Sequence, residues 1–321
     1  MARFDSWMPM RVGWNDSSPE IEWLLLGDRR FTHPFFEDTI QEALRHPFHH
    51  AFRRSTDLDA LHSWYEESPG LAPKGFIFHL SRCGSTLLCQ VLATLERNIV
   101  LSEPPPVDAL LRGHIRNPAL DPRQRSEQIR WMLSAMGQKR HSTEEGVYVK
   151  FDCWSIPELP VVSRAFPSVP WIFLYRDPLE VLVSQLQIRA LWSLPGGLPP
   201  EILGVHAADM PLDEYCARML GRICEIALDQ FRRTPGGLLV NYAEMPAFCT
   251  SGMLRHFQME VGAEEVERMR QASVANSKNP TLPFEPDGDV KRHAATERMR
   301  ELADRWIAPF YEELEIARRR Q

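Results

Sequence analysis

Residues 75–86, which read GFIFHLSRCGST, determine the fold that we expect for this chain. Gly75–Leu80 is a short apolar run typical of a buried strand, and residues 85–95 have the pattern of a helix. Between the two lies a turn of small residues with one arginine and one glycine. A strand that runs through a tight turn directly into a helix is typical of the first half of a βαβ unit.

Four further apolar runs follow at intervals, separated by stretches with helical periodicity. They are mostly continuous rather than alternating, as expected of parallel strands that are buried on both faces. A long helix is expected over residues 212–231, where apolar residues recur at helical spacing. The sequence therefore predicts an α/β fold, a P-loop NTPase-like central parallel sheet flanked by helices, whose later strands are Ile99–Leu101, Val147–Phe151, Trp171–Tyr175 and Leu238–Tyr242.

The first 70 residues have a different pattern and contain no convincing strand. Phe35–Ile40 and Asp57–Glu66 each favour a short amphipathic helix. The stretch Ser68–Pro73 (SPGLAP) interrupts the chain with proline and glycine. We therefore predict a small, mainly helical N-terminal segment over residues 1–70 and an α/β domain over residues 71–321.

Composition narrows the class of ligand and the compartment. The chain has 37 Lys and Arg against 43 Asp and Glu, a net charge of −6. This balance argues against nucleic acid and membrane surfaces as partners but leaves room for a small anion held by a few local cations. The six cysteines form no C-x-x-C pair, and no apolar run is long enough for a signal peptide or a membrane span. We expect a cytoplasmic protein without a metal site.

The turn at residues 81–86 has the features of a phosphate-binding loop. Backbone N–H groups at the start of a helix attract phosphate. Gly84 allows close backbone approach, Ser85 and Thr86 add hydroxyl donors, and Arg82 adds a positive charge. It is not a Walker A loop, which would need glycine at position 79 and lysine at position 85. The alternative is a generic helix-capping turn with an exposed arginine.

A second anion-binding pattern follows the strand at residues 171–175. Arg176 stands at the end of this strand, and Asp177 and Pro178 are typical of the start of a helix. Ser184 lies on that helix, eight residues after the arginine, so the two side chains are able to converge on one anion. The alternative is an arginine paired with a nearby acid, Glu180 or Asp177.

Together these two segments resemble the sulfotransferases that use 3′-phosphoadenosine 5′-phosphosulfate (PAPS). Phe78–Leu87 (FHLSRCGSTL) resembles the family's 5′-phosphosulfate loop, in the P-R-S-G-[ST]-[ST] style of the carbohydrate and tyrosyl-protein sulfotransferases. Leu174–Ser184 (LYRDPLEVLVS) is similar to the family's 3′-phosphate motif. The resemblance implies an enzyme that transfers a sulfuryl group from PAPS to a hydroxyl or amine, releases 3′-phosphoadenosine 5′-phosphate (PAP) and needs no metal.

The resemblance also implies which residues bind the donor. Lys291 lies in a stretch, GDVKR, that is only a loose stand-in for a basic signature of the phenol and steroid branch, and Lys291 and Arg292 are equally compatible with surface charges. The predicted cofactor-binding residues are Arg82, Cys83, Gly84, Ser85, Thr86, Arg176, Ser184 and Lys291. No nearby histidine pattern activates Cys83, so we expect its thiol to be passive.

Four residues are candidates for catalysis: Arg82, Glu103, Lys150 and Asp152. Lys150 ends a buried strand, where a lysine is costly unless it meets an anion. In the family a lysine at the corresponding strand end contacts the phosphosulfate. The alternative is a structural ion pair with Asp152 or Glu103. Glu103 is the first candidate for the base that takes the acceptor's proton, and Asp152 is the rival.

Two other functions stay open on the sequence, namely a P-loop kinase or phosphotransferase and a non-catalytic nucleotide-binding protein. The acceptor is expected to be a small molecule or a peptide. The N-terminal segment and residues 190–211 are candidates to line its pocket. His79, on the first strand, is expected to be a core residue that satisfies backbone groups.

Overall fold

The central sheet consists of five parallel strands, one for each apolar run found in the sequence. The computed structural model describes residues 6–16, 18–207, 210–275 and 287–321. The strand order is β5–β6–β4–β7–β8, with every neighbouring pair parallel. The predicted α/β fold is confirmed, with strands β4 (Pro73–His79), β5 (Asn98–Ser102), β6 (Gly146–Lys150), β7 (Trp171–Tyr175) and β8 (Gly237–Asn241).

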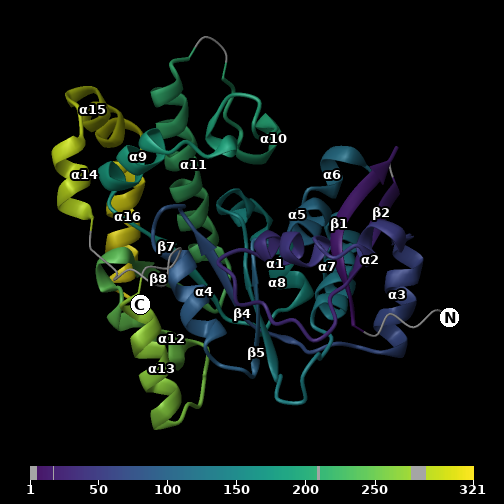
Figure 1. Cartoon of the computed structure of the whole chain (residues 1–321). Helices are drawn as coiled ribbons and strands as arrows, with labels where there is room; N and C mark the ends of the chain where they lie inside the picture. The colour runs from purple at the N-terminus through teal and green to yellow at the C-terminus, as the bar shows by residue number, and fades with distance from the viewer. Residues whose placement is uncertain (1–5, 17, 208–209, 276–286) are drawn as a thin grey trace.

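Both faces of this sheet are buried, which explains why the strands read as continuous apolar runs. Side chains alternate between the faces. Phe76 and Phe78 of β4 belong to the hydrophobic cluster on one face, and Ile77 belongs to the cluster on the other. Each face is covered by helices (Figure 1).

Three helices contribute to the cluster on the Ile77 face: α4 (Ser85–Ala93), α12 (Gly252–His256) and α13 (Ala263–Ser273). The opposite cluster includes α7 (Pro122–Met136), α8 (Leu159–Ala165) and the long helix α11 (Leu212–Arg233). The helices expected over 85–95 and 212–231 are thus confirmed. Helix α9 (Pro178–Gln187) leaves the end of β7, where Asp177 caps it by accepting a hydrogen bond from the Glu180 N–H at 3.1 Å.

The remaining elements are short or lie near the C-terminus. Helices α14, α15 and α16 follow one another in the yellow part of Figure 1, and α14 and α15 pack on α9. The bounds of these elements are α5 (Pro105–Leu111), α6 (Gly113–Arg116), α10 (Pro200–Leu203), α14 (Gly288–Ala294), α15 (Glu297–Trp306), α16 (Ala308–Arg318) and the 3₁₀ turns η1 (Cys153–Glu158), η2 (Leu191–Ser193), η3 (Tyr242–Glu244) and η4 (Ala247–Thr250).

The N-terminal segment contains an antiparallel sheet, so the expectation that it has no strand is wrong. A bulge between Pro9 and Arg11 of the first strand breaks the period-two alternation and hides the strand in the sequence. The expected helices are present, although the segment as a whole is mixed rather than mainly helical. Residues 1–5 and 17 lie outside the described residues. The elements are β1 (Trp7–Asn15), β2 (Ser18–Leu25), α1 (Phe36–Leu44), α2 (Phe48–Ala51), β3 (Arg54–Thr56) and α3 (Leu58–Glu67).

The N-terminal sheet shares one hydrophobic core with the central sheet. Buried Ile21 and Trp23 belong to the same cluster as Phe76 and Phe78. At the connection, a Cβ on Gly70 would lie 2.1 Å from the Ser134 carbonyl oxygen of α7, so the chain is docked there. The division at residues 70/71 stays a prediction. Among the described residues, no helix has the length and apolar character needed to cross a membrane.

Candidate functional site

A cavity of about 570 Å³ lies at the edge of the central sheet where the parallel strands end. Ligands of α/β proteins bind at this edge because the loops that follow the strands meet there. Of the site residues predicted from the sequence, only Lys150 does not line this cavity, and it lies behind the wall. The residues that do line it are Arg82, Cys83, Gly84, Ser85, Thr86, Glu103, Asp152, Arg176, Ser184 and Lys291.

The turn between β4 and α4 has an unusual backbone. Ser81, Arg82 and Gly84 have positive φ angles of 74°, 51° and 86°. A non-glycine residue in this region costs about 1–2 kcal/mol, and successive residues of this kind turn their N–H groups toward one concave surface that binds anions. In the described part of the chain, the N–H groups of Gly84 and Thr86 donate to no backbone or side-chain acceptor. The turn therefore presents unsatisfied donors to the cavity.

Arg82 supplies a positive charge to this part of the cavity without a bound acid. One guanidinium nitrogen donates to the Ile188 carbonyl at 3.3 Å, and its buried Nε has no partner. No carboxylate among the described residues forms an ion pair with it. Burial lowers the pKa of Arg82. A half-buried cation with an unused donor favours an anionic ligand.

The environment of the Cys83 thiol makes it unreactive. It is buried and donates to the Leu174 carbonyl oxygen at 3.1 Å. Burial raises its pKa to about 11, so the group is a neutral thiol near pH 7. This geometry agrees with the expectation that Cys83 is passive.

Lys150 and Glu103 form a buried ion pair at the ends of neighbouring strands. The Lys150 ammonium is fully buried and lies 3.0 Å from Glu103 Oε1 and 3.5 Å from Thr86 Oγ1. Burial alone would raise the pKa of Glu103, but the charge of Lys150 and the contact with His79 bring it down to about 2. The ion-pair alternative for Lys150 is thus the arrangement found.

His79 links this pair to the phosphate-binding turn. Its Nδ1 accepts a hydrogen bond from the Ser81 N–H at 3.0 Å, and its Nε2 lies 3.2 Å from Glu103 Oε1. Burial lowers the pKa of His79, so the ring is neutral, with its proton on Nε2 toward Glu103. His79 is the buried, backbone-satisfying residue that the sequence indicated, and its Nε2 lies close to Glu103.

Asp152 also lines the cavity, and it differs from Glu103 in its hydrogen bonding and in the direction of its pKa shift. Its side chain makes no hydrogen bond or ion pair within the described residues. Burial, together with the negative charges of Asp108 and Glu103, raises the pKa of Asp152 well above its usual range. Asp108 is itself held by the Trp154 indole N–H at 2.9 Å. Asp152 is therefore a weaker acid than Glu103.

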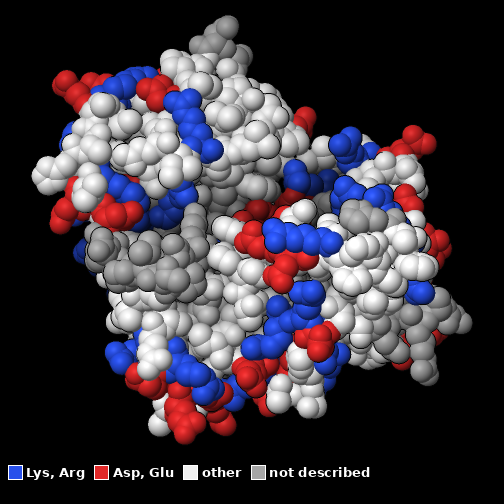
Figure 2. Space-filling model, viewed as in Figure 1, with Lys and Arg blue, Asp and Glu red and all other residues white. Residues whose placement is uncertain are grey.

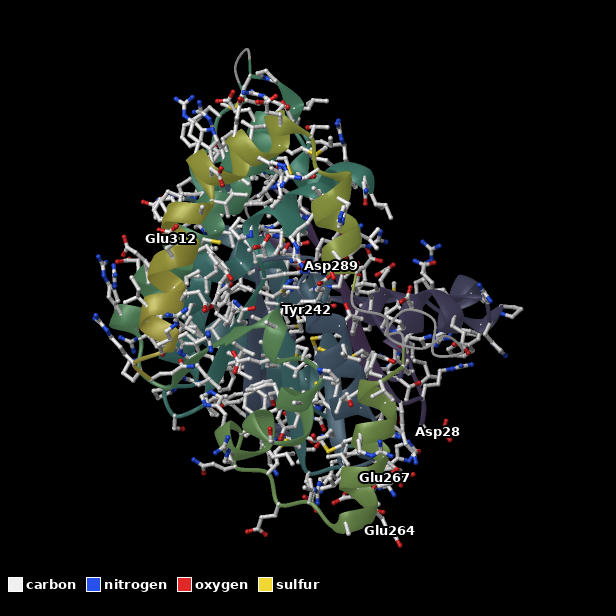
Figure 3. All side chains as sticks on the ribbon, turned by 90° about the vertical axis from the view of Figure 1, so that its left-hand side faces the viewer. Asp28, Tyr242, Glu264, Glu267, Asp289 and Glu312 are labelled. Atoms are coloured by element: carbon white, nitrogen blue, oxygen red, sulfur yellow. The ribbon has the colours of Figure 1, made fainter. Side chains whose placement is uncertain are left out.

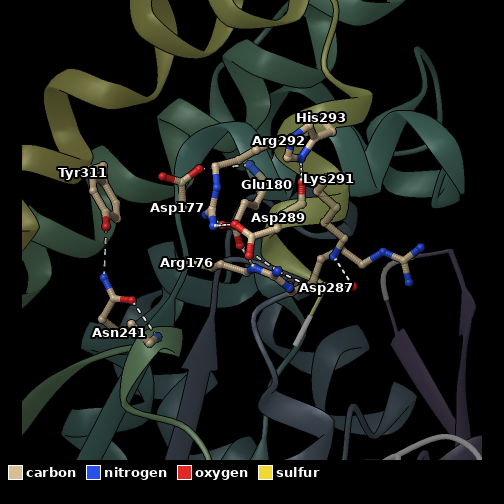
Figure 4. Close-up of polar contacts among 12 residues, drawn as sticks. Arg176, Asp177, Glu180, Asn241, Asp287, Asp289, Lys291, Arg292, His293 and Tyr311 are labelled. Atoms are coloured by element: carbon tan, nitrogen blue, oxygen red, sulfur yellow. Dashed lines mark hydrogen bonds and ion pairs between the residues drawn. The ribbon is translucent and has the colours of Figure 1, made fainter. Parts of the chain in front are cut away.

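Arg176 lies beside the turn, in a dense set of contacts, and one of its terminal nitrogens donates to the Arg82 carbonyl oxygen at 3.5 Å. Its Nε donates to Glu180 Oε2 at 2.7 Å, and one terminal nitrogen lies 2.6 Å from Asp287 Oδ1 (Figure 4). The guanidinium stacks on the Tyr242 ring at 4.1 Å. Figure 3 shows Tyr242 in the middle of the molecule, in the same region as the helix with Asp289. Arg176 therefore forms the ion pair with Glu180 that the sequence offered as an alternative. This pair does not exclude a ligand on the remaining N–H donors of Arg176.

Ser184 and Lys291 line the cavity together with Arg176. Ser184 is buried on α9 and lines the cavity. Lys291 is only 8% exposed, and its ammonium lies 2.7 Å from Asp287 Oδ2. Lys291 is therefore not a surface charge. Arg292, the other cation of that stretch, pairs outside the cavity with Glu180 and Asp289.

The sequence reasoning missed several residues of this site. Tyr242 follows strand β8, so the rule that strand ends meet at one edge was enough to find it. Asp287 carried no such signal, because its role depends on where α14 docks. Phe35 and Trp154 line the cavity although no motif contains them.

Charges of both signs are interspersed over the face shown in Figure 2, without a broad field of Lys and Arg among the residues coloured there. Among the described residues, no group of three His, Cys, Asp or Glu side chains is arranged to hold a metal ion.

No protein-family model and no curated protein match the chain. Several solved structures are similar to it. One is a sulfotransferase from Mycobacterium avium (TM-score 0.45, 14% identity, covering 65% of this chain and 71% of that one). Another is a sulfotransferase from Mycobacterium tuberculosis (TM-score 0.46, 12% identity, 77% and 80% covered). A third is a sulfotransferase from Alicyclobacillus acidocaldarius (TM-score 0.41, 16% identity, 78% and 96% covered). Similarity at this level does not establish an activity.

Proposed function

We propose that this chain is a sulfotransferase that moves a sulfuryl group from PAPS to a hydroxyl or amine of an acceptor. The observation that carries the proposal is that one cavity holds two neighbouring sets of anion-binding groups. The turn at residues 81–86 forms one set, and Arg176 with Lys291 forms the other. PAPS and PAP carry phosphate on both the 3′ and the 5′ side of the ribose, so a single ligand engages both sets.

In this proposal the 5′-phosphate is bound by the turn, whose Gly84 and Thr86 N–H groups have no other partner in the described structure, and the 3′-phosphate is bound by cations that already pair with carboxylates. The N–H groups of Gly84 and Thr86 and the hydroxyls of Ser85 and Thr86 donate to the 5′-phosphate. Cys83 contributes only its backbone, since its thiol is bonded elsewhere. Arg176, Ser184 and Lys291 hold the 3′-phosphate.

In the transfer step, the acceptor oxygen or nitrogen attacks sulfur in line with the bridging oxygen of the 5′-phosphate. The new bond to sulfur forms as the bridging S–O bond breaks, and its electron pair leaves on the 5′-phosphate to give PAP. Arg82 stabilises the negative charge that develops on the bridging oxygen. Lys150 acts as a positioning residue, because it contacts Glu103 and Thr86 from behind the cavity wall.

The acceptor's proton passes to a carboxylate, and Asp152 fits this role better than Glu103. A general base works best when its pKa is near the working pH. The Glu103 carboxylate, with a pKa of about 2, is too weak a base for that. Asp152 has a raised pKa and no competing partner in the described structure.

The acceptor end of the cavity is apolar. Phe35 from the N-terminal segment, Trp154 and Trp192 line the cavity, and the rings of the two tryptophans lie 6.2 Å apart. Ile188 and Leu191, exposed by 70% and 73%, form the rim. Residues 190–192 belong to the stretch 190–211 that we expected to line the pocket, of which 208–209 lie outside the described residues. We propose an acceptor that presents its hydroxyl or amine from an apolar body, either a small molecule or a peptide side chain.

We further propose that the enzyme works in the cytoplasm. All six cysteines are free thiols and buried. A secreted domain with six cysteines would ordinarily pair them.

The test is incubation with sulfur-labelled PAPS and a panel of phenols, lipids, sugars and peptides. We expect a labelled product and release of PAP, both lost in Asp152→Asn. Release of PAP without an acceptor would also support the donor assignment. Arg232→Ala is the control, because Arg232 is an exposed arginine that pairs with Glu313 away from the cavity.

Two outcomes would overturn the proposal. Magnesium-dependent turnover of ATP, with no binding of PAP, would identify a phosphotransferase. Binding of PAP without transfer to any acceptor, unchanged by Asp152→Asn, would identify a non-catalytic nucleotide-binding protein.

A further inference from the structure

An internal carboxylate already occupies the two cations at one end of the cavity. Asp287 Oδ1 lies 2.6 Å from a terminal nitrogen of Arg176, and its Oδ2 lies 2.7 Å from the Lys291 ammonium (Figure 4). We call Arg176 and Lys291 the clamp. Each oxygen of one carboxylate meets a different cation, so the clamp has the spacing needed to hold an anion with two acceptor oxygens.

The partners of Arg176 differ in burial, and this separates permanent contacts from replaceable ones. The Glu180 side chain is 7% exposed and also pairs with Arg292, so it is fixed on the inner side. Tyr242 supports the guanidinium plane by stacking. The Asp287 side chain, in contrast, is 48% exposed and lines the cavity. Removing it from the clamp returns a carboxylate to water at little desolvation cost.

The backbone next to Asp287 is seated closely on α9. A Cβ on Gly288 would lie 2.6 Å from Glu180 Oε1, so the backbone here approaches the Glu180 carboxylate closely. Asp287 directly precedes this contact, so docking of α14 delivers its carboxylate to the clamp. Although burial alone would raise the pKa of Asp287, Lys291 and Arg176 lower it, and the group is ionised near neutral pH.

We propose that Asp287 is the internal counter-ion of the clamp and determines which nucleotides this end of the cavity accepts. The inference rests on the proposed function, since it takes the 3′-phosphate of PAPS or PAP as the group that replaces the carboxylate. A phosphate dianion offers more charge and more acceptor oxygens than a carboxylate, so it competes for both cations. A 3′-hydroxyl carries no charge and leaves the Asp287 ion pairs intact. Any anion that binds the clamp must displace Asp287, so Asp287 weakens the binding of every anion there. Only an anion that binds the two cations more strongly than the carboxylate does is bound on balance.

The experiment compares PAP with adenosine 5′-monophosphate, which lacks only the 3′-phosphate, by calorimetric titration of the full chain. In Asp287→Asn the side chain keeps its shape but loses its charge. We expect this variant to bind PAP about tenfold more tightly, a size typical of coupling between competing groups, while its affinity for the monophosphate changes less than about twofold. Asp289→Asn is the matched control, because it removes the same charge two residues further along the chain, from a side chain that is 85% exposed and pairs with Arg292.

The outcomes separate this inference from the proposed function. If the unmodified chain binds PAP and Asp287→Asn binds it no more tightly than Asp289→Asn does, Asp287 is not the counter-ion and only this inference fails. Equal tightening toward both nucleotides would also overturn it, because the effect would then not involve the 3′-phosphate. If the unmodified chain binds no PAP, the proposed function fails. Inorganic phosphate then tests the clamp alone: stronger stabilisation of Asp287→Asn than of Asp289→Asn against thermal unfolding supports the counter-ion, and equal stabilisation refutes it.

Discussion

The ammonium of Lys150 lies 3.0 Å from the carboxylate of Glu103, across the ends of the neighbouring strands β6 and β5. The lysine side chain has no exposed surface, whereas the glutamate side chain is 25% exposed. The pair therefore brings a positive charge to the cavity wall without opening it to solvent. Each member depends on the other, because an unpaired charge in this position is costly.

Removing one member of this pair should destabilise the chain more than removing both. We expect Lys150→Met or Glu103→Gln alone to lower the free energy of unfolding by about 3–5 kcal/mol, and the double variant to lose less than either single variant does. Urea unfolding of the four proteins measures this coupling. Additive losses would show that the two charges do not interact.

The same pair should make stability depend on pH. Glu103 has a pKa of about 2 in the folded chain against an ordinary value of 4.5. Its contribution is therefore fully present above about pH 4.5 and is lost as the pH falls toward 2. Lys150→Met should flatten this part of the curve of unfolding free energy against pH. An unchanged curve would mean that another group lowers the pKa of Glu103.

Loss of the Asp152 carboxylate should abolish turnover without affecting donor binding. We expect Asp152→Asn to lower kcat by about 10²–10⁴-fold, the range typical of a general base, and to leave the affinity for PAP unchanged. Because the pKa of Asp152 is raised, activity of the unmodified enzyme should rise with pH as this carboxyl loses its proton. If the activity of Glu103→Gln rises with pH in the same way as that of the unmodified enzyme, Asp152 is supported as the base. Disappearance of that rise in Glu103→Gln instead would transfer the role to Glu103.

Arg176 should be irreplaceable by lysine. Its planar guanidinium bonds Glu180, stacks on Tyr242 and still directs donors to the cavity, which a single ammonium cannot reproduce. We expect Arg176→Lys to weaken PAP binding about as much as Arg176→Ala does, by at least about tenfold. Titration with PAP measures the loss. Near-normal affinity in Arg176→Lys would show that charge alone is enough.

Gly84 should tolerate no side chain, for two separable reasons. Its φ of 86° disfavours any other residue, and a Cβ there would lie 3.0 Å from the Tyr242 ring. Gly204 is a matched control, since its φ is 70° but a Cβ would meet nothing within 4 Å. We expect Gly204→Ala to cost about 1–2 kcal/mol from the backbone alone, and Gly84→Ala to cost more and also to weaken PAP binding. Equal losses of unfolding free energy would show that Tyr242 moves away freely.

Local patterns in the sequence were sufficient for the sheet and for most of the cavity. The five strands were predictable because burial on both faces makes them continuous apolar runs, and β7 spans Trp171–Tyr175 as expected. Once parallel strands are assigned, their carboxyl ends share one edge of the sheet, so Arg82 and Arg176 had to lie at that same edge. The N-terminal sheet was missed because its first strand carries a bulge at Pro9–Arg11.

The sequence by itself therefore determined which residues stand at the ligand-binding edge, because that placement follows from periodicity and chain direction. Only the tertiary structure decided the partners of those residues. Lys150 was free to meet an anionic ligand, Asp152 or Glu103, and packing brought it to Glu103. Asp287 reaches Arg176 from 111 positions further along the chain. Contacts of this kind depend on how whole helices dock, and no pattern within a short window of sequence encodes that docking.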